Sequence, residues 1–557
     1  MKTKTHLKRL LTLLAAVASL SSLSAQGILG GHVTGNVQLE AQMSHADSSI
    51  GAPDVPQALL MNARADVLYT NGDFSAGLRF EAYQDPLLGF DPQWKGQGLA
   101  NYFIAYNGER LSLTAGHFYE QFGSGLILRT YEDRYLGIDN ALLGFSAKYR
   151  PIDGITLKAV AGKQRYFWTL GNGLVRGVDG EVALNSILPF MAESMLRVNL
   201  GAGFVSKYEE NENIAAEIPG LILNLPLNVG AGAVRADVAF GGWNLQAEYA
   251  RKGQDPSALN GYIYRPGEAM TLNLSYSQRG FSASLQAKRI DNMGFKSMRS
   301  QTGEMLYINY LPATPRQHTY AFPSMYPYAT QVNGEQGLQA DVMYKIKKDT
   351  WLGGKYGTDL HLNSSVMTTL DTTVTGGRGT DGYTVGGSTG NLLYGDVSFE
   401  VARKLSKNVK ICATYLYQVF NPIVENEHGN LHHNNAVVAD INWKVSKKHA
   451  LRFEAEWLGS DSRYDPGDNE TDRRAGDWLM GLVEWSIGSH WFLSASDQYA
   501  YNDGTGNYYN LSVGYTQGAT RLQVGYGKQR EGMLCIGGVC RQVPASNGLS
   551  ISLTTSF

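Results

Sequence analysis

The segment NVQLEAQM (residues 36–43) alternates strictly between polar and apolar side chains. Its even-numbered residues are Asn, Gln, Glu and Gln, and its odd-numbered residues are Val, Leu, Ala and Met. A period of two places these two sets on opposite faces of an extended chain. The pattern therefore predicts a β-strand with one face in an apolar environment and the other in water.

The same alternation recurs along most of the 557-residue chain. It is found in residues 62–69, 74–82, 243–249, 270–276, 281–287, 409–417, 437–445, 451–457, 509–515 and 549–557. Counting the strands in up-and-down order gives about 24, with 20 and 22 as alternatives, because boundaries read from one sequence are uncertain by several residues. The fold class predicted is all-β.

The connections between these segments differ systematically in length. Tight turns such as 71–73, 107–109 and 241–242 alternate with long polar connections such as 253–267 and 460–477. Short turns at one end and long loops at the other are typical of a transmembrane antiparallel up-and-down β-barrel, with the turns in the periplasm and the loops outside. A closed barrel leaves no unpaired backbone edge in lipid. No apolar run reaches the roughly 18 to 20 residues of a membrane-spanning helix.

The two ends of the chain predict an exported protein. Residues 1–25 combine a basic start, an apolar stretch and a Ser-rich end, as a secretory signal peptide does. Residues 26–557 are then one outer-membrane barrel of a Gram-negative bacterium, in contact with outer-membrane lipid. The last strand, 549–557, ends in Phe557 and resembles the signal by which the barrel-assembly machinery recognises its clients. A formal net charge of −2 gives no indication of a nucleic-acid partner.

Charged residues interrupt the alternation between Ala115 and Pro151. Since lipid does not accommodate them, we expect them at the mouth or in the lumen of the barrel, as a mixed-charge constriction. The alternative is a salt-bridged loop that braces the wall. The candidates are Arg129, Glu132, Asp133, Arg134 and Asp139 in this region and Arg64, Asp66, Arg79 and Glu81 on the polar faces of two strands.

The longest connection spans residues 292–336, far beyond the usual length of a structureless loop. Its prolines stiffen the chain and its aromatic residues can pack, which argues against disorder. Two interpretations remain: a loop folded into the lumen as a plug or constriction, or an ordered cap on the exterior. The aromatic candidates are Tyr307, Tyr310, Tyr320, Tyr326 and Tyr328.

Four blocks of sequence resemble an uncharacterised family of large outer-membrane barrels from Bacteroidota-type bacteria. They are FYEQFGSGLI (118–127), LGIDN (136–140), INYLPATPRQHTYAFPSMYPYATQVNGE (308–335) and GVCRQVPASNG (538–548). The resemblance implies location and architecture over the whole mature chain. It assigns no activity and no site residues.

Two further clusters are weaker candidates. His428, His432 and His433 carry imidazoles that suit a transition metal, although solvated histidines are commoner. Cys535 and Cys540 have the spacing of a disulfide-closed hairpin, which an exported location permits. Catalytic motifs such as G-x-S-x-G and H-E-x-x-H are missing from the sequence, so we expect neither an enzyme nor a cofactor.

These observations favour a porin-like outer-membrane channel, passive or gated by a loop, for small hydrophilic solutes. The solute itself is not indicated by the sequence. The alternative is a barrel that transports nothing and serves as a scaffold or receptor for other envelope or secretion-system proteins.

Overall fold

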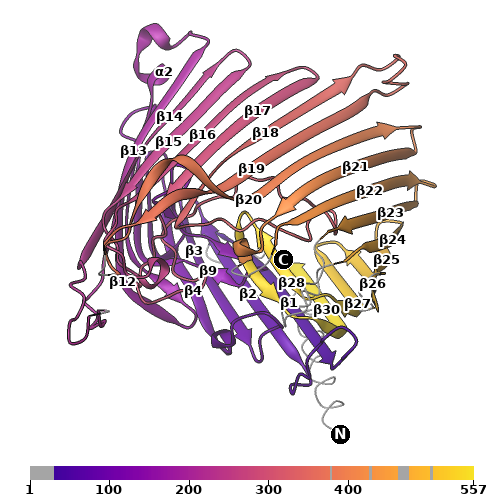
Figure 1. Ribbon diagram of the computed structural model, residues 1–557, viewed down its shortest axis with the longest axis horizontal. Coiled ribbons are helices and arrows are strands. Elements are labelled where there is room, and N and C mark those ends of the chain that lie inside the picture. The colour runs from indigo at the N-terminus through magenta and orange to yellow at the C-terminus, as the bar shows by residue number, and fades with distance from the viewer. Residues whose placement is uncertain (1–29, 217, 377–378, 426–429, 462–475, 502–505) are drawn as a thin grey trace.

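The computed structural model describes residues 30–216, 218–376, 379–425, 430–461, 476–501 and 506–557. Twenty-four of its strands form one antiparallel sheet that closes on itself (Figure 1). The predicted fold class and strand number are confirmed. The predicted signal peptide, residues 1–25, lies outside the described residues.

The wall of the barrel is built in sequence order. Its strands are β1 (His32–His45), β2 (Leu60–Asn71), β3 (Phe74–Tyr83), β4 (Gly96–Asn107), β5 (Leu111–Phe118), β10 (Leu142–Tyr149), β11 (Ile155–Tyr166), β12 (Thr169–Ala183), β13 (Leu196–Tyr208), β14 (Asn228–Phe240), β15 (Trp243–Lys252), β16 (Gly267–Gln278), β17 (Phe281–Asp291), β18 (Gly334–Ile346), β19 (Thr358–Val374), β20 (Tyr383–Lys404), β21 (Val409–Phe420), β22 (His432–Lys444), β23 (His449–Ser460), β24 (Trp478–Ile487), β25 (Trp491–Ala500), β26 (Gly506–Gln517), β27 (Thr520–Gln529) and β30 (Ser546–Ser556).

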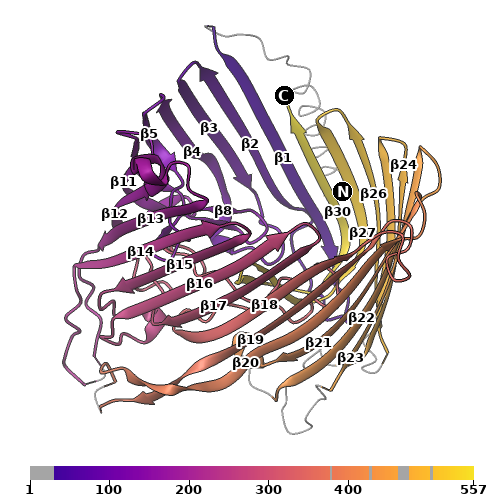
Figure 2. The same cartoon turned by 90° about the horizontal axis from the view of Figure 1, so that it is seen from above.

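The first and last strands close the barrel. β1 pairs with β2 on one side and with β30 on the other, so the two ends of the colour ramp lie side by side in Figure 2. The backbone amides of Gly35 and Phe557 each donate to the carbonyl of the other, at 2.9 and 3.0 Å. The terminal residue is therefore part of the ladder, and no edge of the sheet is left unpaired.

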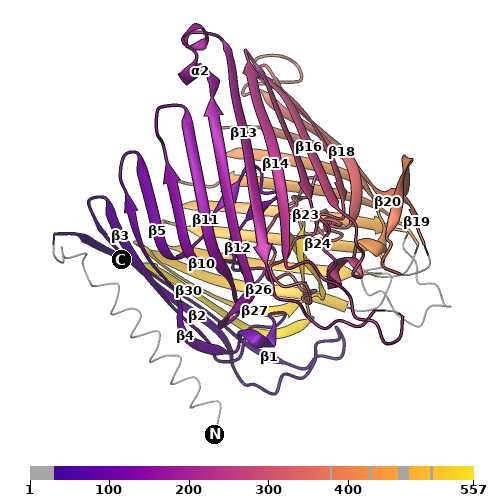
Figure 3. The same ribbon diagram turned by 90° about the vertical axis from the view of Figure 1, so that its left-hand side faces the viewer.

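The two ends of the barrel differ as predicted. At one, here called the turn end, most neighbouring strands are joined by tight turns such as 241–242, and β12 joins β13 through the short helix α2 (Leu184–Ile187) (Figure 3). At the other, the loop end, the connections are longer and include residues 119–141, 209–227 and 292–333. The predicted long connection 292–336 thus ends three residues earlier, where β18 begins.

Alternation assigns the two faces of the wall. The outer face exposes large apolar side chains, for example Leu78, Ile104 and Phe204. The inner face carries polar residues such as Arg64 and Glu81, which are buried beneath the loops. In the described parts of the chain, no helix has the length and apolar character needed to cross a membrane.

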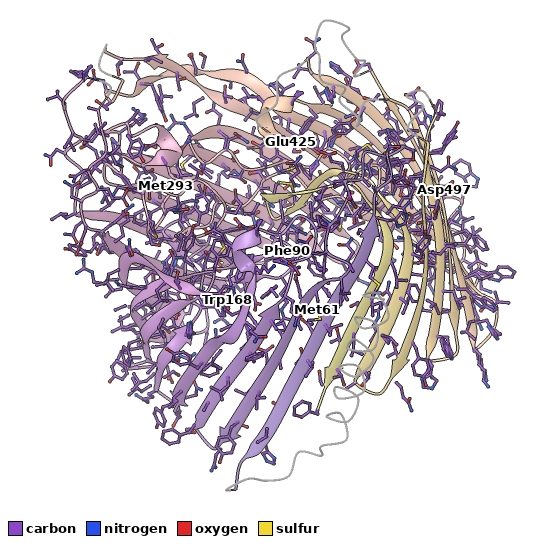
Figure 4. All side chains as sticks on the ribbon, turned by 90° about the horizontal axis from the view of Figure 1, so that it is seen from below. Met61, Phe90, Trp168, Met293, Glu425 and Asp497 are labelled. Atoms are coloured by element: carbon purple, nitrogen blue, oxygen red, sulfur yellow. A yellow bond between two sulfur atoms is a disulfide. The ribbon has the colours of Figure 1, made fainter. Side chains whose placement is uncertain are left out.

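The packed core of this molecule lies inside the bore. Figure 4 shows side chains filling the space that the wall encloses, with the labelled Met293 and Phe90 over this interior. Met293 is fully buried, and it belongs to a cluster of apolar residues shared by the inner wall and the in-folded loops. A second apolar cluster, around Phe322 and Trp478, lies on the side of β20 to β26.

Candidate functional site

Two connections from the loop end fold into the bore and bind each other. We call them together the plug, residues 119–141 and 292–333. The backbone amide of Arg129 donates to the carbonyl of Ile308 at 2.8 Å, and that of Tyr310 donates to the carbonyl of Gly125 at 3.0 Å. The Asn309 amide group donates to the carbonyl of Leu126 at 3.1 Å. The two connections, more than 150 residues apart in sequence, therefore form one unit.

An apolar core fixes this unit against the wall. Phe122, Leu126, Phe295 and Ile308 are fully buried and pack on inner-wall valines of β12 and β13, such as Val205. Burial of an aliphatic or aromatic side chain of this size contributes about 1.5–3 kcal/mol. Sequence alternation did not reveal this core, because the apolar residues come from irregular loops.

The predicted mixed-charge residues form a network between the plug and the first strands. Glu132, in the short strand β8 (Glu132–Asp133), binds both Arg64 and Arg79, the latter at 3.3 Å. Arg79 also binds Asp66 at 2.5 Å. Burial disfavours the carboxylate of Glu132, but the hydrogen bond and charge of Arg64 and the charge of Arg79 outweigh it and hold its pKa below the usual range. Arg134 reaches the same carboxylate at 3.4 Å.

A second part of this network is more deeply buried. Arg165 of β11 binds Glu81 of β3 and Asp139 of the plug, both at 2.6 Å. Asp139 belongs to the short strand β9 (Ile138–Asp139). Trp94 in the 3-10 turn η1 (Pro92–Trp94) lies under the Arg165 guanidinium, 5.0 Å from ring centroid to carbon. Sequence reasoning missed Arg165, because alternation shows which face a residue occupies and not which loop will meet it.

The remaining charged candidates brace the plug internally. Arg129, in the short strand β7 (Leu128–Arg129), stacks on the rings of Tyr310 and Tyr131, at 4.0 and 5.1 Å from their centroids. Asp133 accepts hydrogen bonds from the backbone amides of Tyr135 and Leu136. These two residues are not brought into the network around Glu132.

A different part of the plug runs along the inner face of the wall formed by β20 to β23. We call residues 312–331 the plug arm. Arg316 lies 3.5 Å from Glu400, and His318 Nε2 lies 3.1 Å from Asp396 Oδ2, so the arm follows the inner face of β20. Further along, the backbone amides of Ala321 and Phe322 donate to the two carboxylate oxygens of Glu456 on β23, at 3.0 and 2.8 Å. Each of these polar groups of the arm contacts a carboxyl group of the wall.

The predicted aromatic residues pack inside the plug or against the wall. Tyr326 contacts the rings of Phe420 and His432, and the Tyr328 hydroxyl donates to Glu335 at 2.6 Å. Tyr320 shares a hydrogen bond with the thiol of Cys412, which lies on the inner face of β21. Tyr307 stacks under the ammonium of Lys296 at 4.3 Å. The five tyrosines therefore hold the plug in place.

A disulfide hairpin at the loop end holds the arm from the other side. β28 (Gly532–Ile536) pairs with β29 (Val539–Val543), and Cys535 is bonded to Cys540. The carbonyl of Gly537 at the hairpin tip accepts from the Tyr310 hydroxyl at 2.6 Å and from the Ala313 amide at 3.2 Å. The Gly538 carbonyl accepts from the Thr330 amide at 3.0 Å.

A buried group of lysines was also missed by sequence reasoning. Lys207 and Lys252, both at the loop end of their strands, bind Asp255 at 2.9 and 3.7 Å and flank the ring of Phe295. The Lys207 ammonium also donates to the carbonyl of Lys296 in the plug at 2.8 Å. Nothing in the sequence indicates this cluster, since the residues are spread over 90 positions.

The histidine candidates are not assembled into one site by the described residues. His432 is buried against Tyr326, whereas its neighbour His433 lies near Tyr417 on the other face of β22. His428 lies outside the described residues. Within the described ranges, no group of three His, Cys, Asp or Glu side chains is placed to hold a metal ion.

The sequence of the chain matches one protein family over almost its whole length. Residues 7–557 match the family described as "Family of unknown function (DUF6029)". The chain belongs to this family. The expectation of an uncharacterised family that spans the mature chain is confirmed. No curated protein matches the chain.

The solved structures with a similar fold share little sequence identity with this chain. The siderophore receptor PirA from Pseudomonas aeruginosa is 9% identical, with 94% of this chain and 80% of that chain covered and a TM-score of 0.40. The outer membrane protein opdK from Pseudomonas aeruginosa and the translocation pore of the P pilus usher PapC are each 10% identical, with 94% and 99% covered and TM-scores of 0.34. At these identities the likeness concerns the fold alone.

Proposed function

We propose that this DUF6029 protein is an outer-membrane channel for small hydrophilic solutes, and that its own plug closes the channel and the plug arm gates it. The turn end faces the periplasm and the loop end faces the exterior. The observation that supports this proposal best is that one segment of the plug, around Arg316 and His318, meets the wall through polar contacts, whereas residues 119–141 and 292–311 meet it through a buried apolar core.

The first attachment is largely apolar. Residues 119–141 and 292–311 share an apolar core with the wall, and Asp139 is buried and paired with Arg165. Breaking such contacts exposes apolar surface and leaves buried charges without partners, each of which costs several kcal/mol.

The plug arm combines apolar contacts in the second cluster, where Phe322, Met325 and Tyr326 are buried, with polar anchors. Its anchors Arg316, His318 and the amides of Ala321 and Phe322 all meet carboxylates on β20 and β23. Water replaces such polar contacts at a net cost of about 1.5–3 kcal/mol for a hydrogen bond to a charged group. The segment around Arg316 and His318 is therefore the part of the plug that leaves the wall at the lowest cost, and its movement uncovers the polar side chains of Glu400 and Asp396.

Single-channel recording in planar bilayers tests this function. Asp291 and Gly334 are paired across β17 and β18, so a short Gly–Ser linker can join the strands when residues 294–332 are removed. We expect the intact protein to show rare, brief openings and the deletion variant to show a large, steady conductance. Heat-modifiable electrophoretic mobility establishes that each variant is a folded barrel.

A folded deletion variant that conducts no ions would contradict the channel. In that case the closed bore is a structural core, and the protein acts as a scaffold or receptor through its exposed ends.

A further inference from the structure

The turn end carries an uneven distribution of charge. Three consecutive turns, taken with adjoining strand residues as 345–357, 403–410 and 444–448, contain one acidic residue, Asp349. They contain Lys345, Lys347, Lys348, Lys355, Arg403, Lys404, Lys407, Lys410, Lys444, Lys447 and Lys448. We call these three turns the basic rim. A chain with a net charge of −2 does not produce such an excess by composition alone.

The basic rim is continuous in space. Its turns join β18 to β19, β20 to β21 and β22 to β23, which are consecutive strands of the wall. The Lys444 amide donates to the carbonyl of Asn408 at 2.7 Å, and an added Cβ at Gly354 would meet the guanidinium of Arg403. All its lysines are exposed. Of these, Lys345 is paired with Asp359 at 2.7 Å.

The rest of the turn end is balanced. The other turns of this end carry Asp73, Glu109, Asp153 and Glu193 against Arg110, Arg150 and Arg279. Lipid headgroups surround a barrel on all sides, so attraction to lipid alone gives no reason for cations along one arc. By alternation Lys404, Lys410 and Lys444 lie on the inner face, where a headgroup in the bilayer does not reach them.

Apolar side chains stand among these cations. Trp351 is 90% exposed, and Leu352 and Leu405 are exposed by more than half. An aromatic anchor with a polar rim around it is a common arrangement at protein–protein interfaces. Further into the bore, Arg452 is surrounded by Asp440, Glu454 and Glu484. An acidic segment is attracted to the mouth and repelled deeper inside.

We propose that the basic rim is a docking surface for an acidic segment of another protein, rich in Asp and Glu with some apolar residues, on the side of the membrane that the turn end faces. Lysines supply the long-range attraction, and Trp351 supplies the apolar contact. This inference does not depend on whether the bore conducts.

The test uses the full-length protein in nanodiscs of phosphatidylcholine and a fluorescent peptide of repeated Glu-Glu-Leu, with binding followed by anisotropy at about 150 mM salt, where the Debye length is about 8 Å. The rim variant combines Lys347→Glu, Lys348→Glu, Lys407→Glu, Lys447→Glu and Lys448→Glu. The control makes two charge reversals, Arg110→Glu and Arg150→Glu, in exposed turns of the same end outside the basic rim. A second variant with Gln at the five rim positions serves if charge reversal impairs folding.

We expect the rim variant to lose at least tenfold in affinity and the control to bind as the intact protein does. Trp351→Ala is expected to weaken binding several-fold without changing its salt dependence. Absence of binding to the intact protein, or equal binding by the rim variant, would overturn the proposal. So would phosphatidylglycerol that co-purifies with the intact protein and not with the rim variant while the peptide fails to bind, because the rim would then belong to lipid headgroups.

Discussion

Arg165 on β11 donates to Glu81 on β3 and to Asp139 in the plug, and all three side chains are almost completely buried. One guanidinium thus joins two distant strands of the wall through the bore. Removing one partner of a buried ion pair leaves uncompensated charge, which costs about 3–5 kcal/mol. We expect Arg165→Met to lower the free energy of unfolding by this amount, measured by urea denaturation of the folded barrel in lipid.

The control for this prediction is Arg150→Met, an exposed cation in the turn between β10 and β11, whose effect should stay within about 0.5 kcal/mol. Adding Glu81→Gln and Asp139→Asn to Arg165→Met removes the stranded charges and should restore part of the loss. Equal stability of Arg165→Met and the intact protein would show that the triad does not hold the plug.

The anchor of the plug arm on β23 gives a second prediction. Glu456 accepts two backbone hydrogen bonds from the arm, and Glu456→Ala removes both. We expect the fraction of time that the channel is open in planar bilayers to rise by at least about tenfold, since each hydrogen bond is worth about 0.5–1.5 kcal/mol and two are lost. Glu484→Ala on β24, whose described partner is Arg452, is the control and should leave gating unchanged. An unchanged open fraction in Glu456→Ala would exclude this anchor as part of the gate.

The wall of the barrel can be predicted from the sequence to a greater extent than the plug inside it. Alternation such as that in residues 36–43 is a local property of each strand, and it predicted the barrel, its strand number and the inner position of Arg64 and Arg79. The partners of these residues depend on how the loops fold. Glu132 was singled out because charges stood out in its loop, whereas Arg165 and Lys207 lie in ordinary strands and meet plug residues about 26 and 89 positions away. Such long-range pairing leaves no periodic pattern in the sequence.

The tip of the disulfide hairpin gives a third prediction. Gly538 has a φ of +90°, and an added Cβ would lie 2.9 Å from the Cβ of Ala313 in the plug arm. Gly538→Ala should therefore displace the arm and increase the reaction rate of Cys412, under Tyr320, with a charged thiol reagent. Gly220→Ala adds the same group at a φ of +83° with nothing within 4 Å, so it introduces similar backbone strain without touching the arm. If Cys412 reacted at the same rate in both variants, the hairpin would not determine the position of the arm.

Lys296 in the plug gives a prediction about pH. Burial lowers the pKa of Lys296 to about 8, an effect that the charge of Glu304 offsets only in part. The unfolded lysine has its usual pKa of about 10.4, so between these values the unfolded chain binds a proton that the folded protein does not. Stability from this group therefore rises with pH across this window and is constant below it.

Comparing Lys296→Met with the intact protein isolates the pH dependence of stability that comes from Lys296. Lys296→Met removes the hydrogen bond to the Gly303 carbonyl and the contact of the ammonium with the Tyr307 ring, so the comparison rests on how the difference between the two proteins changes with pH and not on its size at one pH. We expect the difference in thermal unfolding midpoint, intact protein minus Lys296→Met, to become more positive from pH 8 to pH 10. Lys355→Met, an exposed lysine of the turn end, should show no such change. A difference that is independent of pH would mean that Lys296 is solvated, and that this part of the plug is open to water in the folded barrel.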